Sequence, residues 1–444
     1  MNLVYGIKDK PKFGQLLIFA FQQVLAILAA TIAVPAIIGN GMSQSAALFG
    51  AGVGTLVYQL FTKFNSPVFL GSSFAFIGSM FAAFGGAASA SAGYAGLILG
   101  AAFAGLVYVI IAVVVKFVGV KWISKLMPPV VIGPTVAIIG LSLAGNAVGD
   151  LTTGKVLVDG VSACSPYVAL ICGLVTLFSV VVISVYGKKM AKLIPFILGI
   201  LAGYIVAAIF TVIGIATNNV ALQVINFSVF QNMQIFTIPE FTMLAAADGL
   251  KQIDGAFIAT VAVAYVPVAF VVFAEHIADH KNLSTIIGQD LLEEPGLHRT
   301  LLGDGIGSVA GAIFGGCPNT TYGESVGCVA ITRNASVVTV TAAAIMCIVI
   351  SFFGPFVTFL ASIPNCVMGG VCVTLYGFIA VSGLKMIQQV NLSASKNLFV
   401  VAIILITGIG GLSLTFGKVT LTSIACALIL GIIANLVLAS GKED

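Results

Sequence analysis

Long apolar runs separated by short polar stretches dominate this chain. A helix that crosses a bilayer needs about 20 predominantly apolar residues. Runs of this kind predict crossings at 13–38, 45–61, 94–118, 130–148, 167–186, 193–216, 255–279, 336–362, 366–383, 398–416 and 419–438, with shorter apolar pieces at 69–84, 301–314 and 323–332. We therefore expect an all-α polytopic membrane protein with fourteen transmembrane segments.

Two of the short pieces have the pattern of broken helices. Residues 65–74 and 317–324 each place polar residues and glycine before an apolar half-helix. Irregular backbone at membrane depth is tolerated only where it is buried in protein or lines a cavity, because lipid cannot satisfy free N–H and C=O groups. Paired broken segments therefore predict a binding site between them, where the amides at the start of each half-helix can donate to a ligand.

The two halves of the chain show weak similarity to each other. Pro128 to Gly133 resembles Pro364 to Gly369, and each stretch begins the fifth predicted crossing of its half. Seven crossings are an odd number, so a duplicated unit would insert with the opposite orientation. We expect a 7+7 inverted repeat, the plan of many secondary transporters.

Composition and charge agree with a membrane protein. Hydrophobic residues make up 59% of the chain and charged residues 8%, which excludes an ordinary soluble domain. If the N-terminus is cytoplasmic, every lysine and arginine except Lys155, Lys251 and Lys418 falls on the cytoplasmic side. We therefore expect a multi-pass protein of the cytoplasmic membrane with both termini in the cytoplasm. No clustered basic and aromatic surface indicates nucleic acid.

Of the acidic residues, Glu275, Asp279 and Glu324 are placed most clearly within predicted crossings. A charged side chain at the bilayer centre costs about 2.5 kcal/mol or more, so such residues usually face a cavity, an ion path or a substrate. We expect the three acids to converge on one cavity, where neighbouring carboxylates share protons and can bind and release one with a substrate. Asp254 and Asp304 lie nearer to segment ends. The alternative, neutralisation by a base within the bundle, has only Arg333 to supply it.

Other classes of function remain open at this point. His276 and His280 lie one helical turn apart, as two metal ligands could, and an intramembrane metalloenzyme would use them with a carboxylate. We interpret them instead as interfacial residues next to Lys281, and we expect no metal and no cofactor. A passive channel is a further alternative, which the paired broken segments disfavour.

Three motifs carry a resemblance to a known family: Ala274 to His280, Pro318 to Arg333, and Gly71 to Phe76. Together they resemble the nucleobase-ascorbate transporter family, in particular its bacterial uracil permeases, and the resemblance extends over essentially the whole chain. It implies a transporter and not an enzyme. The expected function is proton-coupled import of uracil by alternating access. A xanthine or other purine permease is the alternative, and an anion transporter shares the architecture.

The resemblance also implies two domains. The core domain would comprise residues 1–126 and 218–362, and the gate domain 127–217 and 363–444. Short antiparallel strands in the third and tenth segments would form the site between them, and a homodimer would form through the gate domains.

Residue roles follow from the same resemblance. Glu275 and Glu324 would accept hydrogen bonds from the nucleobase, and the backbone amides of Phe74 and Gly323 would contact it. Uracil has two N–H donors and two carbonyl acceptors, which suits two acids and two amides. The remaining expected residues are Ser73, Tyr322 and Tyr376 at the substrate, Asp279 with Glu324 for proton coupling, and Gln23, Asn319 and Ser325 behind them.

Three positions depart from the family pattern. Ser325 stands where the signature usually has asparagine, Gln23 where many relatives carry histidine, and Asp279 where some uracil permeases carry histidine. Proton coupling would then use Asp279 and Glu324, or Glu324 alone. An aspartate at position 279 also occurs in purine-transporting relatives, whereas the glutamate at position 324 favours uracil.

Overall fold

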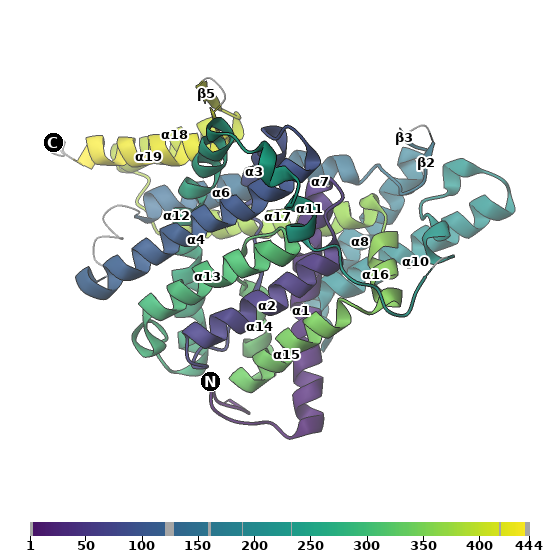
Figure 1. The fold of residues 1–444 in the computed structure, drawn as a ribbon, viewed down its shortest axis with the longest axis horizontal. Helices are drawn as coiled ribbons and strands as arrows, with labels where there is room; N and C mark the ends of the chain where they lie inside the picture. The colour runs from purple at the N-terminus through teal and green to yellow at the C-terminus, as the bar shows by residue number, and fades with distance from the viewer. Residues whose placement is uncertain are drawn as a thin grey trace.

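The computed structural model describes residues 3–119, 128–158, 161–188, 190–231, 233–416 and 419–439. Within these residues the protein is mostly helical, with a few two-stranded sheets (Figure 1). Lys418, the expected domain boundary at 126/127 and the last five residues lie outside the described residues.

The first half of the chain runs from α1 to α10. Its elements are α1 (Phe13–Ile38), α2 (Gln44–Phe61), β1 (Leu70–Ser72), α3 (Ile77–Gly85), α4 (Ala90–Val118), α6 (Pro129–Ser142), α7 (Ala144–Asp150), β2 (Leu157–Val158), β3 (Val161–Ser162), α8 (Pro166–Tyr186), α9 (Met190–Leu193) and α10 (Pro195–Ala216). Short helices connect it to the second half: η1 (Val220–Leu222), η2 (Phe227–Phe230), α11 (Thr242–Ala246) and η3 (Gly249–Gln252).

The second half runs from α12 to α19. Its elements are α12 (Gly255–Ile287), η4 (Leu292–Gly296), α13 (Leu297–Gly315), β4 (Asn319–Thr321), α14 (Gly323–Thr332), α15 (Val337–Ile350), α16 (Gly354–Ser362), α17 (Asn365–Ile387), α18 (Ser395–Ile409), β5 (Leu414–Phe416), β6 (Val419–Leu421) and α19 (Ser423–Ala439).

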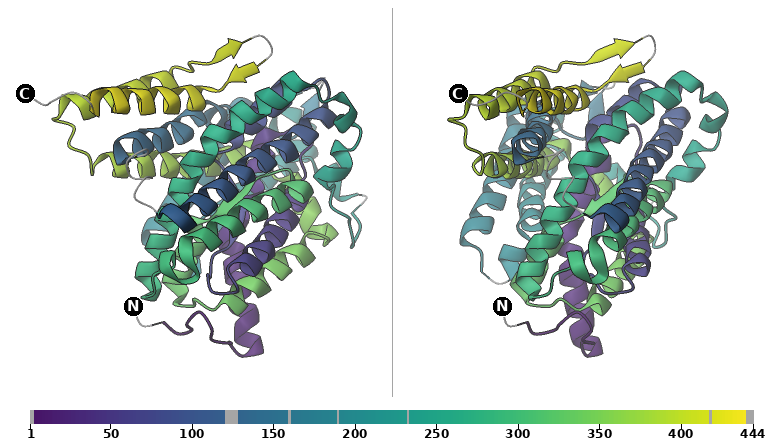
Figure 2. Two further views of the ribbon diagram at one scale, coloured as in Figure 1. Left: turned by 60° about the vertical axis from the view of Figure 1, so that its left-hand side comes forward. Right: turned by 90° about the vertical axis from the view of Figure 1, so that its left-hand side faces the viewer.

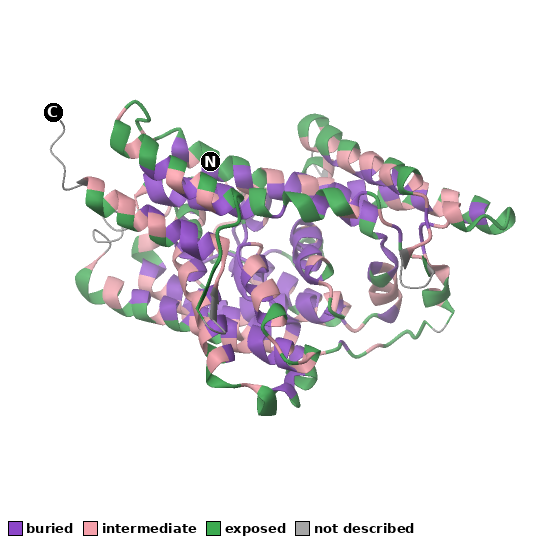
Figure 3. Ribbon diagram, turned by 90° about the horizontal axis from the view of Figure 1, so that it is seen from above, coloured by how far each residue is buried: buried purple, intermediate pink, exposed green. Residues whose placement is uncertain are grey.

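The helices have the length and the surface of membrane spans. Seven helical stretches in the described residues are long and apolar enough to cross a bilayer, and α15, α18 and α19 are shorter apolar helices. Large apolar side chains are exposed along the outer helices, for example Phe178 on α8 and Ile205 on α10, whereas buried residues gather toward the middle of the molecule (Figure 3). Exposed apolar surface on this scale indicates contact with lipid. The chain is a multi-pass membrane protein, and the count of fourteen crossings stays a prediction.

Several predicted boundaries were wrong. The predicted crossing at 336–362 is two helices, α15 and α16, because the chain breaks where Phe236 forms a bridge to Phe353 and the Gly354 amide donates to the Ile235 carbonyl. The predicted crossing at 398–416 ends as a helix at Ile409, and its last residues form the β5–β6 hairpin seen at one edge in Figure 2. In contrast, α12 continues eight residues beyond its predicted end, to Ile287.

The helices pack in two groups. In one, α13 lies against α2 and α4, and α1, α3, α12 and α15 complete the group; in the other, α17 lies against α6 and α8, with α10 and α18 beside them. Small residues allow the close approach within each group. A Cβ on Gly54 of α2 would lie 2.7 Å from the carbonyl oxygen of Gly307 on α13, and one on Gly140 of α6 would lie 2.3 Å from that of Tyr376 on α17. The assignment of these groups to core and gate domains stays a prediction.

Candidate functional site

The two broken segments meet as a short antiparallel sheet. Strand β1 pairs with β4 in the register Leu70↔Thr321, Gly71↔Thr320 and Ser72↔Asn319, as predicted for these segments. Each strand leads into a short helix, α3 from β1 and α14 from β4. The N-terminal amides of both helices therefore lie close to the sheet, where they can donate to a ligand.

A glycine is required at the centre of this sheet. The ring of Tyr322 lies against Gly71, and a Cβ at position 71 would come within 2.3 Å of the ring carbon Cε2. The Tyr322 hydroxyl donates to the Ser72 carbonyl at 2.7 Å, which fixes the ring across the strand. The start of α14 is thereby held against β1.

A cavity of about 430 Å³ opens beside the sheet and lies between the two helix groups. Its volume is within the range of small-molecule sites, about 300–1,000 Å³. It is lined by Ser73, Phe74, Ala75, Val136, Ile139, Phe196, Val271, Glu275, Ala278, Asp279, Thr320, Thr321, Tyr322, Gly323, Glu324, Leu375, Phe378, Ile379, Ser382 and Met386. The structure thus brings together seven of the residues selected from the sequence.

The three carboxylates meet in this cavity. Glu275 and Asp279 lie one turn apart near the middle of α12, and Glu324 lies in the first turn of α14. The hydroxyl of Thr321 on β4 donates to Oδ2 of Asp279 at 2.8 Å. Thr321 was not selected from the sequence, because nothing in its position showed that β4 would face α12.

Gln23, Asn319 and Ser325 support the site and do not line it. The Gln23 amide donates to the Ser325 hydroxyl, and that hydroxyl also accepts from the Phe69 amide at 3.2 Å. The Asn319 amide donates to the Gly50 carbonyl at 2.9 Å. These bonds fix α14 to α1 and to the segment before β1, and they fix β4 to α2.

Tyr376 lies behind the cavity. Its ring packs edge-on against Phe74, with the ring centroids 6.2 Å apart, but it is not among the lining residues. Phe196 and Phe378 line the wall instead. The expected contact between Tyr376 and a ligand stays a prediction.

The interpretation of His276 and His280 as interfacial residues was wrong. Both side chains are fully buried. His276 Nδ1 lies 2.6 Å from Oδ2 of Asp304, and His280 Nε2 lies 2.7 Å from the hydroxyl of Tyr58 on α2. Asp304 is also fully buried and lies well inside α13, not near its end. The sequence could not show these partners, because they belong to other helices.

Within the described part of the chain, these histidines belong to no group that could hold a metal ion. Among the residues that the structure describes, no group of three or more histidine, cysteine, aspartate or glutamate side chains could hold a metal ion. The polar side of α12 that carries the histidines is instead occupied by hydrogen bonds to α2 and α13.

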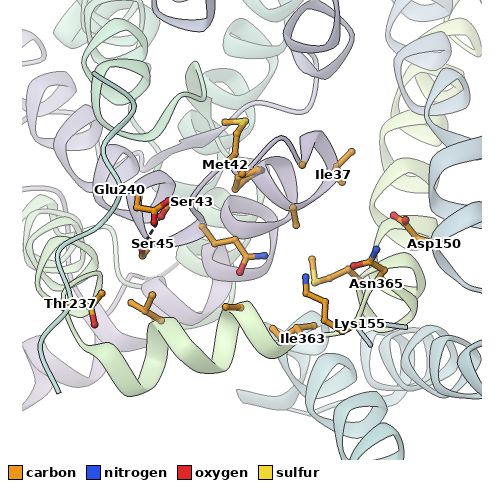
Figure 4. A pocket seen from close by; sticks show the side chains of 18 of the residues that line it. Ile37, Met42, Ser43, Ser45, Asp150, Lys155, Thr237, Glu240, Ile363 and Asn365 are labelled. Carbon is orange, nitrogen blue, oxygen red and sulfur yellow. Dashed lines mark hydrogen bonds between the residues drawn. The ribbon is translucent and has the colours of Figure 1, made fainter. Parts of the chain in front are cut away.

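A second cavity, of about 690 Å³, lies at the other end of α17. The first turn of α17 lines it with Asn365 and Met368, whereas the later turns of the same helix line the first cavity. Figure 4 shows Asp150, Lys155 and Asn365 on one side of this space and Ser43, Ser45 and Glu240 on the other. The two cavities therefore lie toward opposite ends of α17.

Comparison with solved structures defines the class of fold. The chain is similar to the transmembrane domain of a cyanobacterium bicarbonate transporter, BicA, with a TM-score of 0.62 and 17% identity over 98% of this chain and 100% of that one. It is also similar to the murine anion transporter Slc26a9 in its inward-facing state, with a TM-score of 0.66 and 13% identity over 97% and 69%. The chain therefore shares the fold of these two membrane domains.

Sequence comparison gives the family. The model of the Permease family (Xan_ur_permease) matches residues 14–416. The chain is 37% identical to the uracil permease of Bacillus caldolyticus, over 98% of this chain and 94% of the relative. It is 33% identical to the uracil permease of Escherichia coli (strain K12), over 97% and 93%. The chain belongs to the Permease family, which confirms the resemblance found in its motifs, and it is a transporter and not an enzyme.

Proposed function

We propose that this protein imports uracil together with a proton across the cytoplasmic membrane. The observation that carries the proposal is the convergence of Glu275, Asp279 and Glu324 on one cavity beside the β1–β4 sheet. Carboxylates accept from the two N–H groups of uracil, and the amides at Phe74 and Gly323 donate to its carbonyl oxygens. Two relatives named uracil permease, similar over nearly their whole length, support the same substrate.

The proton would travel on the cavity carboxylates. Asp279 is already hydrogen-bonded by Thr321, which stabilises it as an acceptor. Glu324, in the first turn of α14, is the group that we assign to binding a proton with the substrate, with Asp279 as its partner. Because coupled carboxylates titrate as a unit, the proton is assigned to the pair, and only a comparison of variants can assign it to one of the two residues.

Transport would proceed by alternating access between two helix groups. The α13 group would be the core domain and the α17 group the gate domain, with the acids on the core side of the cavity. On the proposed topology, with both termini in the cytoplasm, the C-terminal ends of α12 and α17 face the cytoplasm, and so does the cavity of the carboxylates. The second cavity, at the start of α17, would face outside. A homodimer would form through the gate domains.

The main alternative is a xanthine or other purine permease. The same carboxylates could accept from the ring N–H groups of a purine, and Asp279 is the residue that favours a purine. An anion substrate is disfavoured, because no lysine, arginine or histidine is among the described residues that line the cavity.

Competition binding with purified protein separates these substrates. We expect labelled uracil to bind and to be displaced by unlabelled uracil, but not by xanthine or bicarbonate at the same concentration. Displacement by xanthine at lower concentration than by uracil would assign the site to purines. Displacement by bicarbonate alone would overturn the assignment of the carboxylates to substrate binding.

Gly323→Ala should weaken binding without weakening the fold. Gly323 has no positive φ, and a Cβ there would meet only Oδ1 of Asp279, at 3.9 Å. The added methyl group would occupy cavity space next to the amide that we assign to a uracil carbonyl. We expect the Kd for uracil to rise about tenfold, equal to about 1.4 kcal/mol, with unchanged thermal stability of the ligand-free protein.

Gly327→Ala is the matched control for this substitution. Gly327 lies one turn later in α14, and a Cβ there would meet no atom within 4 Å. It should leave uracil binding unchanged. Equal Kd values for Gly323→Ala and the wild type would contradict the assignment of the Gly323 amide to a uracil carbonyl.

A further inference from the structure

Helix α12 has two polar faces. Glu275, Ala278 and Asp279 line the cavity, whereas His276 and His280 are fully buried on the side of α2 and α13. Successive residues of an α-helix are about 100° apart around its axis, so residues 275 and 276 cannot face the same way. Because both residues belong to one helix, contacts that hold His276 also restrain the direction of Glu275.

The hydrogen bonds of His276 determine where its protons lie. The hydroxyl of Thr300 donates to the Leu297 carbonyl at 3.0 Å, so toward His276 it can only accept. The bond of 3.0 Å between His276 Nε2 and Thr300 Oγ1 is then donated by Nε2–H. A single proton remains for the contact of 2.6 Å between His276 Nδ1 and Asp304 Oδ2.

The pair of His276 and Asp304 has no net charge whether this proton lies on the histidine or on the aspartate. On Nδ1 it makes an imidazolium and a carboxylate; on Oδ2 it makes a neutral imidazole and a carboxylic acid. In both cases the pair can remain fully buried, since no uncompensated charge is left. Asp304 is therefore not a fourth negative charge acting on the substrate.

His280 adds a second attachment. Its Nδ1–H donates to the His276 carbonyl at 2.8 Å, and Nε2 contacts the hydroxyl of Tyr58, which also contacts Ser66 Oγ at 2.7 Å. Ser66 lies in the segment that leads to β1. The network thus connects the histidine face of α12 to α13, to α2 and to the broken segment of the site.

We propose that His276 and Asp304 form a positioning pair that sets the rotation of α12 and so directs Glu275 and Asp279 into the cavity. The pair acts through these two acids and does not touch the substrate. Its effect on substrate affinity rests on the proposed function, whereas its effect on the rotation of α12 does not.

The rotation can be measured without any substrate. Ala278 lines the cavity, and the eight native cysteines are buried, so Ala278→Cys provides one reactive thiol. In this background, His276→Leu or Asp304→Ala should slow alkylation by N-ethylmaleimide about threefold or more. The reason is that rotation of α12 about its axis, even by less than the angle of about 100° between successive residues, moves position 278 away from the cavity opening. Unchanged alkylation rates in both variants would overturn the proposal.

Tyr108→Phe is the matched control. Tyr108 is fully buried near His276, with ring centroids 6.5 Å apart, but its hydroxyl has no hydrogen-bond partner among the described residues. The substitution removes a buried polar atom without breaking the pair. It should leave both the alkylation rate at position 278 and the uracil affinity unchanged. If Tyr108→Phe slowed alkylation as much as His276→Leu, the slowing would reflect a general loosening of the core, and the specific role of the pair would be overturned.

A double-mutant cycle tests whether the two residues act as a unit. His276→Leu and Asp304→Ala should each raise the uracil Kd about tenfold, and the double variant should also cost about tenfold and not hundredfold, because either single substitution already breaks the pair and the second has nothing further to break. His276→Asn, whose amide can either donate to or accept from Asp304, should stay within about threefold of the wild type and covers the case in which His276→Leu does not fold.

The outcomes separate the two proposals. A hundredfold loss in the double variant, or His276→Asn as impaired as His276→Leu in both assays, would overturn the positioning pair. Failure of the wild type to bind uracil would overturn the proposed function, and the alkylation rates at position 278 would still decide the role of the pair.

Discussion

Glu275→Gln is expected to abolish uracil binding. Glu275 lines the cavity from the middle of α12, and we assign it to accept from a ring N–H. Glutamine replaces one carboxylate oxygen by an amide that can only donate, so it presents a donor to a donor and loses the charge-assisted bond. We expect the Kd to rise about 100-fold or more, or about 2.7 kcal/mol, measured by equilibrium binding of labelled uracil to purified protein.

The control for this variant is Glu293→Gln, which makes the same chemical change at an exposed position in the connection before α13. It should bind uracil like the wild type. Tight uracil binding by Glu275→Gln would show that Glu275 does not accept a hydrogen bond from uracil and would leave the acceptor role to Glu324 or Asp279.

Glu324→Gln should separate binding from proton coupling. Glutamine resembles the protonated acid in size and can donate a hydrogen bond, but it cannot release a proton. We expect the variant to bind uracil within about tenfold of the wild type, a loss of about 1.4 kcal/mol at most, and to exchange uracil across the membrane. It should no longer accumulate uracil when a proton gradient is imposed, as measured by uptake into proteoliposomes.

The informative comparison for Glu324→Gln is Asp279→Asn. Asp279 accepts from Thr321, so its amide variant should disturb the contact between α12 and β4 as well as the charge of the cavity. If uracil uptake by Glu324→Gln still depends on the proton gradient and uptake by Asp279→Asn does not, Asp279 carries the proton.

The parts of the site that are marked by composition could be predicted from the sequence. Acids within apolar runs are rare, so Glu275, Asp279 and Glu324 stood out, and the cavity contains all three. Polar residues with glycine before an apolar piece marked the segments that became β1 and β4. In both cases the cost of polar groups in lipid makes the local sequence informative about the tertiary structure.

Features that depend on distant partners could not be predicted. The partners of His276 and His280 are 28 and 222 residues away, so the sequence alone predicts interfacial positions for two histidines that are fully buried. The break before α16 depends on Ile235 and Phe236, which lie more than a hundred residues earlier. The β5–β6 hairpin was also missed, because Leu414 to Phe416 and Val419 to Leu421 have the apolar composition of a helical span.

Uptake of labelled uracil into proteoliposomes, with and without an inward proton gradient, distinguishes proton-coupled import of uracil from the alternatives. We expect accumulation above the external concentration only with the gradient, with no inhibition by excess unlabelled xanthine. Uptake that equilibrates but never accumulates under the gradient would contradict proton coupling. Absence of uracil uptake, with xanthine transported instead, would contradict the assigned substrate.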